Sequence, residues 1–314
     1  MLNVLSITGV IFITIALGYL SVERSLFPES DLKVLGKYVV SFALPALVFR
    51  AVSSRDINEI INIGYLGGYL FGTLAVFTVG YLWSRRVAGD TALQSTFQGM
   101  AVSCANSGFI GYPIVLIAMP SVASTALALN MIVENLVIIP MILIMAEYAS
   151  GGEVQGTKLV RQISIRIIRN PIILGLLLGL AVSLLNIKLP VIISEPVNII
   201  ASSSAALSLV VIGGTLAGLK LKSVDIRIMA MVIGKLMLHP LAVWAGISLL
   251  AIAGYHIADE QLSSAAIIIA ATPAMGIYPI LAQQYGQEKI AALSMLVMTL
   301  LSFFTISTLL WLIG

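Results

Sequence analysis

The sequence predicts an all-α membrane protein, and three observations support this fold class. Of the 314 residues, 59% are apolar and only 10% are charged, and the mean hydropathy is +1.06. A soluble domain carries about 25% charged residues, so most of this surface must face lipid. The apolar runs are long and continuous, and they lack the alternation of a membrane β-barrel. The composition therefore excludes a soluble enzyme and a nucleic-acid-binding protein.

Ten apolar stretches are long enough for helices that cross the bilayer, each of which needs about 20 residues. The longest polar connection, at about 149–167, is too short to fold alone. We therefore expect a first five-helix repeat at 1–149, a cytoplasmic connecting loop at 150–167 and a second five-helix repeat at 168–314. The ten stretches are 2–22, 32–52, 61–83, 92–118, 121–148, 168–187, 191–218, 228–253, 262–284 and 289–313.

The distribution of lysine and arginine predicts the orientation. With the N-terminus outside, 13 basic residues lie in inner loops and 3 in outer loops. Positive residues concentrate on the cytoplasmic side of membrane proteins, so both termini should face outward from the plasma (inner) membrane. The inner set is Arg24, Lys33, Lys37, Arg85, Arg86, Lys158, Arg161, Arg166, Arg169, Lys220, Lys222, Arg227 and Lys289, and the outer set is Arg50, Arg55 and Lys188.

An internal repeat is visible when the chain is shifted by 166 residues against itself. The segment 112–114 then falls on 278–280, and both read Tyr-Pro-Ile. Gly9 also falls on Gly175 and Gly68 on Gly234. Because each half has five spans, the second half must enter the membrane from the opposite side. This pattern predicts the inverted-topology repeat of many secondary transporters.

The fourth and ninth spans are interrupted by glycine and proline. Proline removes a backbone donor and glycine tolerates unwound dihedrals, so both spans should open near mid-membrane. The freed backbone groups must line protein or a cavity, and the half-helix that follows each break presents N–H donors suited to an anion. One kink alone would be an ordinary structural feature, but paired interruptions indicate a binding site. The residues assigned to the breaks are Gly111, Pro113, Pro273 and Pro279.

The segment 106–113, which reads NSGFIGYP, resembles the first crossover motif of the auxin efflux carrier family. The segment 44–49, LPALVF, also resembles that family, and the similarity covers essentially the whole chain. The resemblance implies that spans four and nine cross as broken helices in a transport domain with spans three, five, eight and ten. Spans one, two, six and seven would form a scaffold, and the transport domain would move as an elevator. Members with a short central loop are linked to malonate and malate. Plant members, which export auxin, carry a long loop and an acidic residue in span three that this chain lacks.

The residues beside the two breaks are the candidates for contact with a substrate. We expect Asn106 to contribute most, because its amide stands at the first break. For Asn106, Ser107 and Thr272 the alternative role is hydrogen bonding between helices or to freed backbone groups. The expected substrate-binding set is Asn106, Ser107, Gly108, Tyr112, Thr272, Gly276 and Tyr278.

Five polar residues inside spans five and eight are expected to support this site. Glu134 lies midway along span five, with Asn130 one turn earlier and Asn135 beside it. A carboxylate at this depth is costly, so it either carries a proton or cation or is neutralised by a structural partner. Lys235 either reaches the inner surface or forms a structural pair, for which Glu134 is one partner. His239, one turn later, is expected to be a hydrogen-bonded core residue or a proton relay.

Known catalytic and metal motifs are missing from the sequence. Both Gly-Lys pairs lack the upstream glycine of a nucleotide-binding P-loop, and no His-Glu-x-x-His motif occurs. Only two histidines are present, and the five aspartates lie near span ends. We therefore expect no enzyme activity, no catalytic residue, no cofactor and no resident metal.

The sequence thus predicts a secondary transporter of a small organic anion, a mono- or dicarboxylate such as malonate or malate, held between the breaks. We expect coupling to a proton rather than to sodium, contact with membrane lipid and no nucleic-acid partner; the apolar surface leaves room for a homodimer. Two alternatives stay open. One is a transporter of an auxin-like aromatic carboxylate, and the other is a non-transporting membrane sensor on the same fold.

Overall fold

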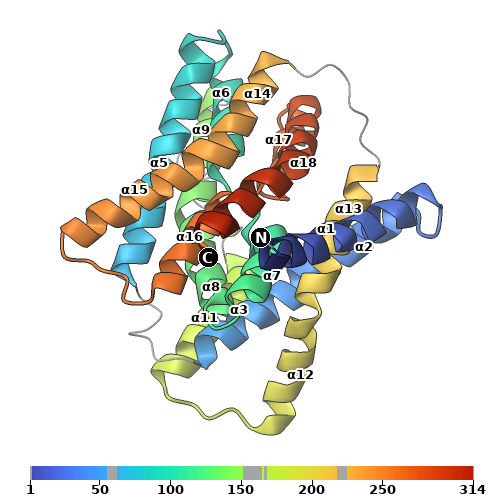
Figure 1. Ribbon diagram of the computed structural model, residues 1–314, viewed down its shortest axis with the longest axis vertical. Coiled ribbons are helices and arrows are strands. Elements are labelled where there is room, and N and C mark those ends of the chain that lie inside the picture. Colours follow the sequence, from blue (N-terminus) through green and yellow to red (C-terminus); the bar gives the residue numbers. More distant parts are fainter. Residues whose placement is uncertain (1, 55–61, 151–164, 166–167, 218–224, 314) are drawn as a thin grey trace.

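The computed structural model describes the chain except for residues 1, 55–61, 151–164, 166–167, 218–224 and 314. Within the described residues every regular element is a helix (Figure 1), some with π-helical segments, labelled η. Seven helices of this part are long and apolar enough to cross a membrane. Three shorter apolar helices cover Ser107–Ala118, Pro171–Leu184 and Glu260–Ala270. The protein is therefore an all-helical integral membrane protein.

Helical residues occur in each of the ten stretches predicted from the sequence. In the first half the elements are α1 (Leu2–Glu23), α2 (Glu29–Tyr38), η1 (Val39–Ala43), α3 (Leu44–Ser53), α5 (Ile63–Arg86), α6 (Ala92–Ser103), η2 (Ser107–Gly111), α7 (Tyr112–Ala118), α8 (Ala123–Val133), η3 (Glu134–Ile138) and α9 (Ile139–Ala149). In the second half they are α11 (Pro171–Leu184), α12 (Val191–Ser202), α13 (Ser204–Ala217), α14 (Ile226–Ile233), η4 (Gly234–Leu238), α15 (His239–Ile252), α16 (Glu260–Ala270), α17 (Tyr278–Gln283) and α18 (Glu288–Ile313).

Both interrupted spans open near their centres. The first opening covers 104–106, between α6 and η2, and the second covers 271–277, between α16 and α17. Of the residues assigned to the breaks, only Pro273 lies in an opening. Gly111 is helical, and Pro113 follows the π-helical segment η2 inside the half-helix Ser107–Ala118. Pro279 occupies the first turn of α17, which tolerates proline because its N–H groups have no partner in the helix.

The two openings cross each other and pair as antiparallel backbone. The N–H of Asn106 donates to the carbonyl of Pro273 at 2.9 Å, and the N–H of Met275 donates to the carbonyl of Cys104 at 3.1 Å. Ala105 and Ala274 face each other in this short bridge. Unwound backbone inside a membrane protein must find partners in the protein, and here each opening supplies them for the other.

Close helix pairs arrange the rest of the molecule. The helix α1 packs on α13, α3 on α11, and α5 on α15. Glycines allow these approaches, because a Cβ at Gly213 would overlap the carbonyl of Ile15 and one at Gly246 would overlap that of Gly68. Figure 1 shows α5, α14 and α15 on one side of the molecule, and α1, α2, α12 and α13 on the other.

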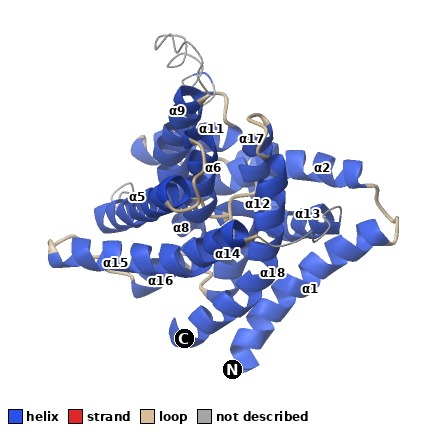
Figure 2. Cartoon of the chain, turned by 90° about the horizontal axis from the view of Figure 1, so that it is seen from above, coloured by secondary structure: helices blue, strands red, loops and turns tan. Residues whose placement is uncertain are grey.

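The start of α1 and the end of α18 lie close together in both views (Figures 1 and 2). The rings of Phe12 and Phe303 confirm the proximity of the two helices, with centroids 4.9 Å apart. Most of the predicted connecting loop and the basic residues Arg55, Lys158, Arg161, Arg166, Lys220 and Lys222 lie outside the described residues, so the domain boundaries and the orientation stay predictions.

Candidate binding site

A cavity of about 620 Å³ lies beside the two openings. Its walls come from the segment α2–η1–α3, from α11 and α13 on one side, and from η2, α9, α17 and α18 on the other. The lining is mainly apolar, and no aspartate or glutamate occurs among the lining residues that the structure describes. Ligand sites commonly combine apolar walls with a few convergent polar groups. The polar lining residues here are Lys33, Lys37, Ser41, Asn106, Ser107, Asn135, Asn170 and Thr215.

Asn106 presents a buried, unpartnered hydrogen-bond donor at this cavity. Its Oδ1 accepts the N–H of Phe109 at 3.2 Å, which fixes the other amide atom as the donor Nδ2. Asn106 is only 1% exposed, and Nδ2 has no partner among the described residues. A Cβ placed on Gly276 would lie 3.8 Å from this nitrogen. Buried donors are nearly always paired in folded proteins, so an acceptor atom of a ligand would supply the partner that Nδ2 of Asn106 lacks.

The half-helix that begins at Ser107 adds backbone donors to the same place. Its helical residues run from Ser107 to Ala118. Neither the N–H of Ser107 nor that of Gly108 reaches an acceptor within the described part of the chain. The first N–H groups of a helix carry partial positive charge and bind anions. Together with the amide of Asn106, they make the wall of the cavity at the first opening suited to a carboxylate.

Glu134 supports the first opening through hydrogen bonds that its carboxyl group accepts. Its Oε1 accepts the N–H of Ala105 at 3.0 Å and the hydroxyl of Tyr69 at 3.4 Å, and its Oε2 accepts the hydroxyl of Ser107 at 3.0 Å. The carboxyl group is fully buried and does not line the cavity. Ser107 does line it, so this hydroxyl connects the cavity with Glu134.

Lys235 holds the second opening in a corresponding way. Its Nζ donates to the carbonyl of Ala270 at 2.7 Å, a group at the end of α16 that has no helical partner. Nζ also lies 2.6 Å from Nδ1 of His239, whose Nε2 is 3.1 Å from the hydroxyl of Thr73. Lys235 is fully buried and does not reach the surface. No ion pair joins it to Glu134 among the residues that the structure describes.

Three residues of α5 connect these groups, and the sequence reasoning did not identify them. Tyr65, Tyr69 and Thr73 are spaced four residues apart and therefore share one helix face. The hydroxyl of Tyr65 donates to Oδ1 of Asn130 at 2.8 Å, while Tyr69 stacks edge-on against the ring of His239. In the sequence, the recurrence of hydroxyl-bearing residues every four positions in an otherwise apolar span indicates this polar helix face.

The remaining predicted residues occupy different positions. Asn135 lines the cavity, and its Oδ1 accepts from Asn170 at 3.2 Å. Tyr112, Thr272 and Tyr278 are buried in the core and lie outside the cavity lining. Thr272 accepts the N–H of Asn106 at 3.1 Å and so supports the crossing of the two openings. A direct role of these three residues in substrate contact stays a prediction.

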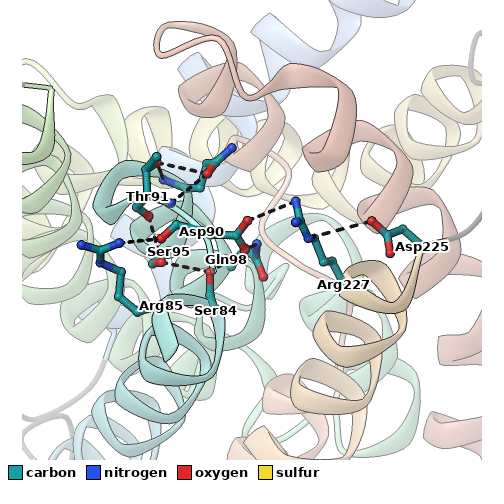
Figure 3. A network of polar contacts seen from close by, with 9 residues as sticks. Ser84, Arg85, Asp90, Thr91, Ser95, Gln98, Asp225 and Arg227 are labelled. Carbon is teal, nitrogen blue, oxygen red and sulfur yellow. Dashed lines mark hydrogen bonds and ion pairs between the residues drawn. The ribbon is translucent and has the colours of Figure 1, made fainter. Parts of the chain in front are cut away.

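A separate polar cluster lies where α5 and α6 meet α14 (Figure 3). Asp90 is buried and accepts the hydroxyl of Ser84 at 2.9 Å, and Arg227 pairs with it at 3.1 Å. Thr91 and Gln94 form the capping box that begins α6 next to this aspartate. Asp90 is near a span end, as expected, but its burial was not predicted. The cluster fixes the first half of the interrupted span against α14.

Comparison with known proteins identifies relatives over nearly the whole chain. The model of the family described as "Membrane transport protein" matches residues 5–312. A protein of Rhizobium meliloti (strain 1021) named "Putative malonate transporter" is 30% identical over 312 residues, which are 98% of this chain and 96% of that protein. The "Uncharacterized transporter YfdV" of Escherichia coli (strain K12) is 24% identical over 276 residues, 84% of this chain and 83% of that protein.

A further relative is larger. The "Lysosomal cholesterol signaling protein" of Mus musculus is 25% identical over 301 residues. The match covers 91% of this chain but 34% of that protein, so the chain spans about a third of its length.

Proposed function

Because the chain belongs to the membrane transport protein family, which is the auxin efflux carrier family, we propose that it is a secondary transporter of a small organic anion. A mono- or dicarboxylate such as malonate or malate is the proposed substrate. One observation carries this proposal: a cavity whose described lining residues include no acid ends at a helix break where Nδ2 of Asn106 has no partner among the described residues. The name of the Rhizobium relative supports the same class of substrate.

In this proposal a carboxylate of the substrate accepts from Nδ2 of Asn106 and from the N–H groups of Ser107 and Gly108. These donors are held in place before the substrate arrives, because Glu134 and the crossing with the second break fix the backbone around them. Preorganised donors favour binding since little ordering remains to oppose it. The apolar remainder of the cavity accommodates the carbon skeleton.

The two halves act as inverted repeats in this mechanism. Two hydrogen bonds join residues separated by 166 positions, the shift of the sequence repeat: Thr73 with His239, and Asn106 with Thr272. Residues related by a two-fold axis meet only near that axis. The packing of the helices agrees with this symmetry. Exchanging the two halves converts the pair α1–α13 into the pair α11–α3, and both pairs are in contact. These contacts support a pseudo-two-fold axis through α5, α15 and both breaks.

An elevator-type motion would provide alternating access. Helices of the proposed scaffold, namely α2–η1–α3, α11 and α13, line one side of the cavity. The breaks and their neighbouring helices line the other side. A site between two such bodies is opened to either side of the membrane when one body slides against the other. Lys33, Lys37 and Asn170 line the cavity at the predicted inner side, which supports an inward-facing state as part of this proposal.

Glu134 is the proposed coupling residue for a proton. It is the acidic group nearest in the hydrogen-bond network to the cavity, and Ser107 connects the two. Protonation of the carboxyl would remove one acceptor from Ser107 or Ala105 and so alter the first break. Intramembrane carboxyl groups in comparable networks serve proton relays in transporters.

The sensor alternative has one specific observation in its favour, the similarity to a relative named as a signaling protein. A sensor would bind its ligand without moving it. The second alternative, an aromatic carboxylate as substrate, is compatible with a cavity of about 620 Å³. Both alternatives differ from the proposal in what crosses the membrane.

Counterflow in proteoliposomes tests all three. Vesicles containing the purified chain are loaded with malonate or malate and challenged with the labelled compound, with aliphatic and aromatic carboxylates as competitors. We expect saturable exchange that aliphatic carboxylates inhibit and that Asn106→Ala abolishes in protein shown to be folded. Exchange by Asn106→Ala equal to wild type would overturn the assigned site. Binding without exchange would favour the sensor, and inhibition only by aromatic acids would favour the auxin-like substrate.

A further inference from the structure

We propose that Lys37 binds a second carboxylate of the substrate, so that the cavity selects dianions over monoanions of the same size. This inference rests on the proposed function, because it assumes that a first carboxylate docks at Asn106. It assigns a specificity role to a residue that the sequence presents only as one of several basic residues near a span end.

The surroundings of Lys37 single it out. It lines the same cavity as Asn106 and Gly108, its side chain is exposed there, and no ion pair or hydrogen bond engages it among the described residues. Lys33, one turn earlier, also lines the cavity but has a partner of its own. Because none of the described lining residues is acidic, Lys37 has no counter-charge in the described part of the wall.

The distance along the second span suits a short diacid. Leu44 lies level with the first break, because a Cβ on Gly108 would be 2.9 Å from its Cδ1. Lys37 precedes Leu44 by seven residues, which is at most about 10 Å along the helix axis, because the π-helical turn Val39–Ala43 rises less per residue than an α-helix. The ammonium group of Lys37 stands on a flexible four-carbon stem that lines the same cavity. The second carboxylate of a short diacid held at Gly108 therefore shares the cavity with this ammonium group.

The two ends of the cavity would then perform different tasks. The neutral donors at the break bind any carboxylate, whereas Lys37 contributes only when a second negative charge is present. Specificity is a difference between two affinities. An unpaired cation produces such a difference when one ligand pairs with it and another ligand does not. Because Lys37 is exposed to the cavity rather than buried, its replacement should leave the fold intact.

Binding of malonate and of malonamate, its singly charged amide analogue, tests this role. Titration calorimetry is carried out at pH 7.5 and low salt on the full chain in detergent. Wild type is expected to bind malonate at least about tenfold more tightly than malonamate. This ratio of affinities corresponds to the contribution of one charge-assisted hydrogen bond. Lys37→Gln should weaken malonate binding by about that factor and leave malonamate within about twofold, and Lys37→Arg should retain the preference.

Arg86→Gln is the matched control, because Arg86 is exposed at the end of α5 and does not line the cavity. It should leave both affinities unchanged. If Lys37→Gln keeps the wild-type preference, or weakens both ligands equally, the role of Lys37 is overturned while the proposed function stands. Wild-type protein that binds monocarboxylates but not malonate also overturns this role alone. Wild-type protein that binds and exchanges no carboxylate overturns the proposed function itself.

Discussion

The two helix breaks are interrupted at corresponding places, yet opposite charges stabilise them. In the first, a backbone N–H of Ala105 is freed and the carboxylate of Glu134 accepts it. In the second, the carbonyl of Ala270 is freed and the ammonium group of Lys235 donates to it. Each charge meets the backbone group of complementary polarity, which is how a buried charge becomes tolerable.

The breaks also differ in what they leave available. The hydroxyl of Thr272 and Nζ of Lys235, beside the second break, have partners in the protein. The hydroxyl of Tyr278, at the start of α17, has none among the described residues, but it lies outside the cavity lining. Beside the first break, Nδ2 of Asn106 also has no described partner, and Asn106 lines the cavity. The first break therefore presents a free donor to the cavity, whereas the second does not.

The largest effect is expected from Asn106→Asp. The new carboxylate keeps the oxygen that accepts from Phe109 but replaces the free donor by a negative charge. Binding of malonate should fall by about 100-fold or more, because a donor is lost and like charges are opposed. Titration calorimetry measures this loss. Asn186→Asp, in an exposed turn between α11 and α12, should bind as wild type; an Asn106→Asp protein of normal affinity would remove the first break as the site.

Lys235→Met tests the second break. Methionine has a similar length but cannot donate, so the carbonyl of Ala270 and Nδ1 of His239 lose their partner. An unsatisfied buried acceptor costs about 1–3 kcal/mol, and we expect the free energy of unfolding to fall by about 2 kcal/mol. Thermal unfolding in detergent should show a lower midpoint. A midpoint equal to that of wild type would mean that the second break does not depend on this ammonium group.

Glu134→Gln separates support of the first break from proton coupling. The amide keeps an oxygen that can accept from Ala105, so the loss of stability should be about 1 kcal/mol, smaller than for Lys235→Met. If Glu134 carries the proton, transport by this variant should become independent of pH between 5.5 and 8, while wild type varies. Initial rates of uptake across this range measure the effect. Glu195→Gln, on an exposed face of α12, is the control, and an unchanged pH profile in Glu134→Gln would exclude the coupling role.

Asp90→Asn concerns an ion pair outside the lining of the cavity. The change weakens its pairing with Arg227, which is partly exposed and retains Asp225 as a second partner at 3.9 Å. A partly exposed pair of this kind contributes about 1 kcal/mol. We expect slightly lower stability with an unchanged KM for malonate, because Asp90 does not line the cavity. A raised KM together with normal stability would show that this cluster acts on the site.

The smallest effect is expected from Gly276→Ala. A methyl group at this position would make ordinary contacts, 3.8 Å from Nδ2 of Asn106 and 4.0 Å from the ring of Phe109. Folding should be unaffected, while the methyl group partly covers the free donor and raises the KM for malonate about threefold, or about 0.7 kcal/mol. Uptake kinetics measure this change. Equal kinetics in variant and wild type would place the substrate away from Gly276.

The two helix breaks could be predicted from the sequence, but their positions could be predicted only in part. Glycine and proline predicted two interrupted spans, and both openings are present. Their positions were less well predicted, because Pro113 lies within the half-helix Ser107–Ala118 and Pro279 in the first turn of α17, and neither lies in an opening. A proline has the same local signature in a kink and in a first helical turn. Only the partners of the neighbouring N–H groups distinguish the two cases.

The side chains of the site show a similar division. Asn106 was predicted from its place beside a break, whereas Lys37 was counted only as a loop charge, and Tyr112, Thr272 and Tyr278 were expected in the site but lie in the core. Glu134 and Lys235 were predicted to be important, but their targets were not. Each binds a backbone group distant in sequence, at Ala105 and Ala270, and no local pattern reports such a contact.

Hydropathy and the positions of glycine and proline determined by themselves that this chain is a helical membrane protein with two interrupted spans. These properties follow from transfer to lipid and from the backbone preferences of glycine and proline, which act along the chain. The tertiary structure alone decided which donors remain free, which charge supports which break and which lysine faces the cavity. Those outcomes depend on helices that meet across the membrane, because a hydrogen bond is satisfied by position in space and not by position in sequence.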